Sequence, residues 1–273
     1  MTAGFETIAG GYSLPEGLRW NDSRLFFADA VAGGVYSWSE GRGADTVIPK
    51  RRGVGGIAVG VDGGLVVTGR NLLHVLNGET RVLFDPPGAR GLNDLTVDSA
   101  GDVLVGVLRM DWRDPASGDP GEVWRVAPGL DPVVEAGPIA YPNGLGFSPD
   151  GTLLYIADYV GAQVLVSDVG RSEPPRLFAA LDRGNADGLA VDSEGGVWVA
   201  TGPGGSFDRF DPAGRLSGRI DPPATFAVTL CFGGGDGREL YLGTADNSER
   251  PELRGTIFRT RSEVPGLEVP RVR

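Results

Sequence analysis

The sequence predicts an all-β protein, a six-bladed β-propeller whose four-stranded antiparallel blades surround a central channel, and three observations lead to this prediction. The 273 residues include 45 glycines and 20 prolines. That share is about twice the average and excludes a helical bundle, because both residues break helices. Hydrophobic residues still make up 41% of the chain, which is enough for a large core. A short apolar–turn–apolar phrase recurs six times, at the spacing typical of propeller blades.

The repeated phrase is a small or polar residue, an apolar run, a turn rich in glycine or aspartate, and a second apolar run. Its copies start roughly 42 residues apart, at Gly17, Gly56, Asp94, Gly144, Gly188 and Thr229. In the fifth copy, Leu189 and Val191 hold alternate positions before the turn, and Val197 and Val199 do so after it. This period of two predicts a β-hairpin. A parallel β-helix would need much shorter repeats, and a helical solenoid would need a 3.6-residue period that is missing.

Strand-like runs between the copies supply the remaining strands of each blade. Examples are residues 34–39, 163–169 and 206–214, each run closed by a turn. We expect the first residues, roughly 5–8, to pair with a strand within 254–261 and so close the ring of blades. Because the six copies fill the chain, residues 1–273 are predicted to form a single propeller domain.

One position of the repeat is unusually polar. The residues that immediately precede the six copies are Glu16, Gly55, Asn93, Asn143, Asp187 and Val228. Asn143 and Asp187 each precede a glycine and, taken singly, are explained as turn residues. Glu16 is not a turn residue, and Asn93 precedes Asp94, so turns alone do not explain the same register in four blades. Because the first strand of each blade lines the channel, we expect these four side chains to converge.

Two carboxylates and two amides, with no Cys or His among them, form a hard oxygen donor set. Such a set favours Ca²⁺, Mg²⁺ or Mn²⁺ over a thiolate-type zinc site. Glu16 and Asp187 would repel each other inside a channel unless a cation lay between them. Three or four protein ligands leave coordination positions open for water and substrate, as a Lewis-acid catalyst requires.

With these residues established, the chain resembles the family of six-bladed propellers that contains senescence marker protein, gluconolactonase and luciferin-regenerating enzyme. The resemblance covers almost the whole chain, and the matching segments are Leu14–Trp20, Leu92–Gly101, Pro142–Asp158 and Ala186–Ala200. It implies one catalytic divalent cation held by Glu16, Asn143 and Asp187. It also implies that Asn93 lies beside the metal and helps to bind substrate or a coordinated water. The activities it implies are hydrolysis of sugar lactones and, in some relatives, of phosphotriesters.

The chain departs from the family where substrate is selected. Gly91 stands where animal-type lactonases carry an arginine, and Arg90 is one step out of register. The sequence Thr201-Gly-Pro-Gly-Gly-Ser replaces a tryptophan-glycine-glycine stretch. Because glycine offers no donor to sugar hydroxyls, we expect weak activity on gluconolactone. Trp112 and Phe207 should make the mouth more apolar, which favours less hydroxylated or aromatic lactones.

Together these features predict a metal-dependent hydrolase that opens a lactone. The cation would polarise the carbonyl and bind a water, and Asp187, as ligand or near-ligand, would remove a proton as general base. Arg90 or Arg109 would steady the carboxylate or hydroxyls of the substrate. Calcium is the first expectation for the metal, and Mg²⁺, Mn²⁺, Zn²⁺ and Fe²⁺ remain alternatives. Two other functions stay open: phosphotriester hydrolysis at the same metal, and a propeller that binds a ligand or protein without catalysis.

Charge and cysteine content limit the partners. The 36 acidic and 25 basic residues give a net charge of −11, which disfavours nucleic acid and anionic lipid. The chain has no apolar run long enough to cross a membrane and no visible secretory signal, so a cytoplasmic location is expected. The single cysteine, Cys231, excludes an internal disulfide. The expected partner is a small-molecule substrate, and the sequence leaves the oligomeric state open.

The only histidine, the only cysteine and one long loop are further candidates for function. His74 lies on an apolar strand and is expected to be a packed or half-exposed strand residue, since no second histidine or nucleophile elbow accompanies it. Cys231 is expected to be a small core residue. The loop from Leu108 to Glu122 is longer than its counterparts and fits equally a lid over the channel mouth or a solvated connection.

Overall fold

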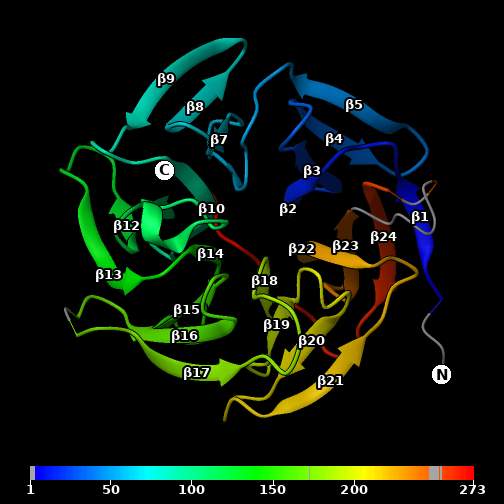
Figure 1. Ribbon diagram of the computed structural model, residues 1–273. Helices are drawn as coiled ribbons and strands as arrows, with labels where there is room; N and C mark the ends of the chain where they lie inside the picture. The colour runs from blue at the N-terminus through cyan, green and yellow to red at the C-terminus, as the bar shows by residue number, and fades with distance from the viewer. Residues whose placement is uncertain (1–3, 172, 246–251, 253) are drawn as a thin grey trace.

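The computed structural model describes residues 4–171, 173–245, 252 and 254–273. Six four-stranded antiparallel sheets are arranged around one axis, as predicted (Figure 1). The first blade consists of β2 (Pro15–Asn21), β3 (Arg24–Asp29), β4 (Val35–Ser39) and β5 (Gly43–Ile48). The second consists of β6 (Ile57–Val59), β7 (Leu65–Val67), β8 (Leu72–Leu76) and β9 (Glu79–Phe84). The third consists of β10 (Gly91–Val97), β11 (Val103–Leu108), β12 (Gly121–Val126) and β13 (Val133–Ile139).

The remaining blades complete the ring. The fourth consists of β14 (Pro142–Phe147), β15 (Leu153–Asp158), β16 (Gln163–Asp168) and β17 (Arg176–Ala180). The fifth consists of β18 (Leu189–Val191), β19 (Val197–Ala200), β20 (Phe207–Phe210) and β21 (Leu216–Ile220). The sixth consists of β22 (Phe226–Gly233), β23 (Glu239–Ala245), β24 (Thr256–Arg261) and β1 (Glu6–Ala9). A 3₁₀ helix, η1 (Pro115–Ser117), lies between β11 and β12.

Burial follows the position of each strand in its blade. All residues of β7, and all but the last of β11, are buried because neighbouring blades cover both of their faces. The outer strand β9 exposes its first four residues to solvent. Apolar residues from adjacent blades share core clusters, which join β3 to β6 and β7, for example. The hydrophobic core is therefore a ring of apolar layers between the blades.

Small residues at the repeat starts allow the inner strands to approach one another closely. A Cβ added to Gly56 would lie 2.5 Å from the backbone nitrogen of Leu95, and one added to Gly188 would lie 2.6 Å from Cα of Thr229. Gly144 would collide in the same way with the backbone nitrogen of Leu189. Larger side chains at these positions would push the strands apart and widen the channel.

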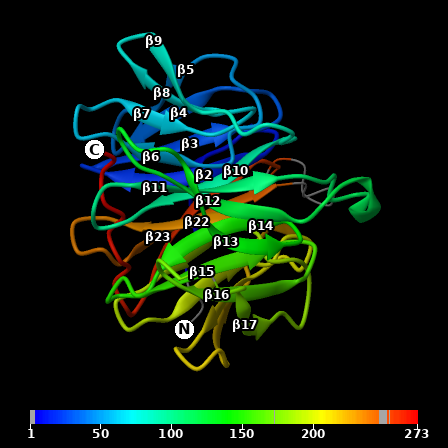
Figure 2. The ribbon, with the colours of Figure 1, turned by 90° about the vertical axis from the view of Figure 1, so that its left-hand side faces the viewer.

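Two connections close the ring. Strand β1 pairs antiparallel with β24, with Glu6 opposite Arg259, which confirms the closure expected from the sequence. The C-terminal segment, residues 265–273, then crosses the face of the ring opposite the β11–β12 loop (Figure 2). Its backbone bonds to two inner strands: Leu267 N donates to Val191 O, and Val272 N donates to Val59 O, each at 2.9 Å. Within the described residues, no helix has the length and apolar character needed to span a bilayer.

Candidate active site

The four polar side chains predicted to converge line one cavity. This mouth cavity has a volume of about 440 Å³ and lies where the inner strands begin. Its floor and walls include Glu16 of β2, Asn93 of β10, Asn143 of β14, and Asp187, which immediately precedes β18. Gly55, from the same position of the second repeat, also lines it. One repeat position therefore supplies groups from five of the six blades to a single space.

Asn143 and Asp187 form the most buried part of this set. Each is only 5% exposed, and Asn143 Nδ2 donates a hydrogen bond to Asp187 Oδ1 at 2.6 Å. The backbone fixes both residues, because Asp187 N donates to Ala200 O at 2.9 Å and Gly144 N donates to Asp187 O at 3.1 Å. The Asn143 side chain thus presents its Oδ1 as a free acceptor beside a buried carboxylate.

The electrostatics of the mouth cavity favour a cation. Burial raises the pKa of Glu16 well above its ordinary value, and the negative charges of Asp187 and Asp94 raise it further. Burial also raises the pKa of Asp187, and Asp94 adds to this effect, while the hydrogen bond from Asn143 opposes it. Among the described residues, no cationic side chain lowers the pKa of either carboxyl group and so compensates its ionised form.

The donor set fits a hard divalent cation rather than a soft one. In the described chain, no three His, Cys, Asp or Glu side chains gather into a metal-binding cluster. The expected ligands are instead two carboxylates and one amide, all with oxygen donors, and buried carboxylates of raised pKa are the groups that a cation would stabilise in ionised form.

Asn93 lies at the side of the mouth cavity with one of its donors already used. Its Nδ2 donates to Pro142 O at 3.2 Å. A Cβ added to Gly55 would lie 2.6 Å from Asn93 Oδ1, so only glycine at position 55 leaves room for this side chain. Asn93 is therefore held between Gly55 of the second blade and Pro142 of the fourth. Its Oδ1 and one N–H of its amide remain available to a ligand.

The two arginines proposed from the sequence are placed differently. Arg90 lines the mouth cavity. Arg109 does not line it: Arg109 Nη2 bonds to Glu122 Oε1 at 2.7 Å, and Arg109 Nη1 donates to Pro87 O at 2.6 Å. The pairing of β11 with β12 brings Arg109 and Glu122 together on the outside of the cavity. This placement corrects the expectation that Arg109 contacts substrate.

An aromatic wall, made of Trp112, Tyr141 and Tyr159, was only partly foreseen. The rings of Trp112 and Tyr159 meet edge to face with centroids 5.7 Å apart, and those of Tyr141 and Tyr159 lie 6.2 Å apart. Burial, followed by the charge of Asp187, raises the pKa of each tyrosine to about 12. Both hydroxyls therefore stay protonated at neutral pH and can donate hydrogen bonds to a ligand. Tyr141 directly precedes Pro142 and Asn143, and this adjacency is the sequence signal that indicates it.

The β11–β12 loop contributes to this wall. Trp112 lines the mouth cavity, whereas η1 has no buried residue and projects away from the blades (Figure 2). Phe207, which the sequence placed at the mouth, is fully buried in β20 and packs in the core between the fifth and sixth blades. Phe207 therefore does not line the mouth, whose apolar lining includes Trp112, the two tyrosines, Phe226 and three leucines.

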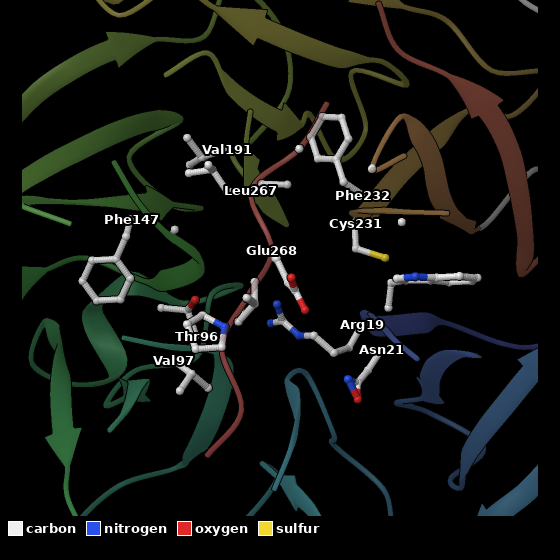
Figure 3. A pocket seen from close by; sticks show the side chains of 18 of the residues that line it. Arg19, Asn21, Thr96, Val97, Phe147, Val191, Cys231, Phe232, Leu267 and Glu268 are labelled. Carbon is white, nitrogen blue, oxygen red and sulfur yellow. The ribbon is translucent and has the colours of Figure 1, made fainter. Parts of the chain in front are cut away.

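A second, larger cavity of about 770 Å³ lies at the opposite end of the channel, and we call it the underside cavity. The C-terminal segment crosses it, and the side chains of Glu268 and Arg19 point toward each other near its centre (Figure 3). Arg19 donates to Ile57 O at 2.9 Å and to Leu95 O at 3.1 Å. Asp94 also lines this cavity; burial raises its pKa to about 7, an effect that Arg19 reduces. The sequence prediction missed Asp94 because it begins a repeat instead of preceding one.

His74 and Cys231, which the sequence predicts to be structural residues, both lie outside the mouth cavity. His74 Nε2 lies 3.0 Å from Asp62 Oδ2 in the second blade, and neither residue lines the mouth cavity. Cys231 is buried in β22, and burial raises the pKa of its thiol to about 12. A thiol with that pKa is not a nucleophile at neutral pH.

Comparisons with known proteins agree with this architecture. The sequence profile of the SMP-30/Gluconolactonase/LRE-like region matches residues 14–246. A 6-deoxy-6-sulfogluconolactonase of Pseudomonas putida is 29% identical over 90% of this chain and 89% of its own. Regucalcin of Xenopus laevis is 29% identical over 92% of each chain. Among solved structures, a luciferin-regenerating enzyme superposes with a TM-score of 0.88 at 22% identity over 99% of both chains, a likeness that shows the fold.

Proposed function

Because the chain belongs to the SMP-30/gluconolactonase/LRE-like family, we propose that it is a divalent-metal-dependent hydrolase that opens a lactone ring. One observation carries this proposal: Glu16, Asn143 and Asp187 lie far apart in the sequence but line one cavity as an all-oxygen donor set, and no described cationic side chain lowers the pKa of either carboxyl group. The name of the Pseudomonas putida relative, a lactonase, supports the reaction class and a small-molecule substrate.

Glu16, Asn143 and Asp187 would hold the cation through their oxygens. Asn143 would use Oδ1, because its Nδ2 already donates to Asp187. A bound divalent cation supplies Lewis acidity and lowers the pKa of a water. Oxygen donors alone favour Ca²⁺, and Mg²⁺, Mn²⁺, Zn²⁺ or Fe²⁺ would be accepted by the same set.

The chain's own residues would carry the proton and orient the substrate. Asp187 removes a proton from the attacking water while the water oxygen adds to the lactone carbonyl carbon. The bond between the carbonyl carbon and the ring oxygen then breaks, and Asp187 returns the proton to that oxygen, which gives an open-chain hydroxy acid. Asn93, Tyr141 and Tyr159 line the cavity around this point and donate hydrogen bonds that orient the ring.

A second candidate reaction is phosphotriester hydrolysis at the same ligands. The aromatic wall of Trp112, Tyr141 and Tyr159 favours it, because aryl or alkyl ester groups would pack against these rings.

The test combines elemental analysis of the purified protein with a substrate panel. Metal-loaded and metal-stripped protein are assayed on γ- and δ-lactones by acid release, and on an aryl phosphotriester by release of the phenol. We expect one divalent ion per chain, lactone opening that disappears on stripping and returns with metal, and weaker phosphotriester turnover. Stoichiometric metal with no turnover of any substrate would instead support a propeller that only binds.

A further inference from the structure

The rim of the mouth cavity has two chemically different sides. The aromatic wall comes from the third and fourth blades and the segments that follow their strands. The neighbouring part of the rim, from the second blade and the start of the third, carries Arg70, which follows β7, and Arg90, which precedes β10. Two cationic side chains at the rim of a cavity are notable in a chain of net charge −11.

Neither of these arginines is committed to the fold in the way that nearby arginines are. Arg51 donates to Thr68 O at 3.0 Å and to Asn71 O at 2.8 Å, and Arg109 is fixed by Glu122. By contrast, the Arg90 guanidinium has no hydrogen-bond or ion-pair partner within the described part of the chain. An unpaired guanidinium beside a cavity is free to bind a ligand anion.

Arg70 is only loosely held and lies next to Arg90. Its Nη1 donates a long hydrogen bond to Ala89 O, at 3.3 Å, which places the guanidinium beside the backbone that immediately precedes Arg90. Its ion pair with Asp85 is 3.6 Å long, and both side chains are more than half exposed, at 64% and 53%. Such an exposed pair contributes little and can exchange Asp85 for a ligand anion.

The backbone fixes the position of Arg90 relative to the candidate metal site. Arg90 N donates to Leu108 O at 2.8 Å, and Leu92 N donates to Gly69 O at 2.7 Å. Arg90 precedes Asn93 by three residues on the same inner segment, and its side chain is exposed; at roughly 3.3 Å per residue its Cα lies at most about 10 Å from that of Asn93. A substrate with its carbonyl beside Asn93 would therefore direct its far end toward Arg90.

We propose that Arg90, assisted by Arg70, binds an anionic substituent on the substrate, so that the preferred lactone carries a phosphate, sulfonate or carboxylate at the end remote from its carbonyl. This inference rests on the proposed lactonase function. Guanidinium groups bind such oxyanions through charge-assisted, often bidentate hydrogen bonds. The carboxylates on the floor would repel the same anion, and this repulsion orients the substrate with its charged end at the rim.

The test compares pairs of lactones that differ only at C6. One pair is glucono-δ-lactone and its 6-phosphate, and the other is glucono-γ-lactone and glucaro-γ-lactone, which carries a carboxylate. The catalytic efficiency kcat/KM is measured by acid release from metal-loaded wild-type protein and from Arg90→Gln. We expect the anionic member of at least one pair to be preferred about tenfold or more. Arg90→Gln should reduce that preference ten- to a hundredfold, mainly through KM.

Arg81→Gln is the matched control. Arg81 is exposed on the outer strand β9 of the second blade, so its loss changes the net charge equally without touching the cavity. This variant should keep the wild-type preference. Equal efficiency on the neutral and anionic members of both pairs, or an unchanged preference in Arg90→Gln, would overturn the inference and leave the lactonase proposal standing. Failure of metal-loaded protein to open any lactone would overturn both.

Discussion

The cavities at the two ends of the channel differ in volume and in the polar groups that line them, and the larger cavity is not the one with the candidate catalytic groups. The underside cavity is the larger, at about 770 Å³ against 440 Å³ for the mouth cavity. Its central cation, Arg19, is already satisfied by two backbone carbonyls, and the C-terminal segment crosses it. The mouth cavity instead gathers two carboxylates and two amides from four blades. Unsatisfied polar groups, and not volume, therefore identify the end at which chemistry is expected.

The origin of this difference lies in the repeat. Residues at the starts of the inner strands occupy one height around the axis, so a polar residue in several copies produces a convergent cluster. Further along the same strands the repeat places apolar residues, such as Leu145 and Leu189, and those residues line the underside cavity. A single repeated register thus gathers the polar side chains that begin the inner strands at the mouth end of the channel.

The largest expected effect comes from removing a carboxylate at the mouth end. Glu16→Gln and Asp187→Asn should each lose bound metal, because each removes one of the two negative charges in the donor set. Catalytic efficiency should fall roughly a hundredfold or more, and Asp187→Asn should lose most, since it also removes the proposed general base. Metal content and kcat/KM are measured on the same preparations.

Glu268→Gln is the control from the other end of the channel. It removes the same charge from the underside cavity and should retain stoichiometric metal and wild-type activity. If both mouth variants also kept full metal and activity, the metal site would have to be sought elsewhere.

The fold and the convergence of four polar side chains on one cavity were predictable because both follow from the repeat. Alternating apolar residues at a regular spacing predict the blades. The residues at one repeat position, Glu16, Asn93, Asn143 and Asp187, form a column around the axis, which predicts that they share one cavity. The course of residues 265–273 was not predictable, because that segment lies outside the repeat and is placed by isolated backbone hydrogen bonds to Val59 and Val191.

Individual side chains outside the column were harder to assign. Arg109 was misplaced because a long side chain is positioned by its partner on the next strand, Glu122, which lies 13 residues away and carries no repeat signal. Tyr141 and Tyr159 reach the cavity from the segments around β14 and β15, where the repeat imposes no residue type. Contacts of this kind depend on which loops face the axis, and the sequence pattern does not contain that information.

A smaller effect is expected at the rim, where we predict that Gly91 limits recognition of sugar hydroxyls. Wild-type protein should open an alkyl or aryl γ-lactone more efficiently than gluconolactone. A missing charge-assisted hydrogen bond costs about 1.5–3 kcal/mol, or roughly ten- to a hundredfold in kcat/KM. Gly91→Arg should recover part of this factor on gluconolactone. Gly91 does not adopt a positive φ, and a Cβ there would meet only Gly69 O, at 3.3 Å, so the substitution needs only a small adjustment.

Gly91→Ala separates the added bulk from the added donor and should give no gain on gluconolactone. Higher wild-type efficiency on gluconolactone than on the alkyl γ-lactone would contradict the argument from Gly91. The assignment of Glu16, Asn143 and Asp187 would be unaffected by that result.

The smallest effect is thermodynamic, and it tests whether the mouth end is held together by a cation. In the metal-free fold the pKa values of Glu16 and Asp187 are raised, whereas in the unfolded chain both carboxyls have ordinary values. The folded state therefore binds more protons above about pH 5, and the metal-free protein loses stability as the pH rises through the raised pKa values. A bound cation favours the ionised carboxylates and offsets this loss, so metal should stabilise the protein more at pH 8 than at pH 6.

At a metal concentration of about 100 times Kd the stabilisation is roughly 2.7 kcal/mol, or about 5–10 °C in Tm. Melting curves in excess chelator and in excess metal at both pH values measure the difference, with Glu268→Gln expected to behave like wild type. Identical curves at both pH values, with removal of the metal verified, would mean that no cation joins the blades at the mouth and would favour a propeller that only binds.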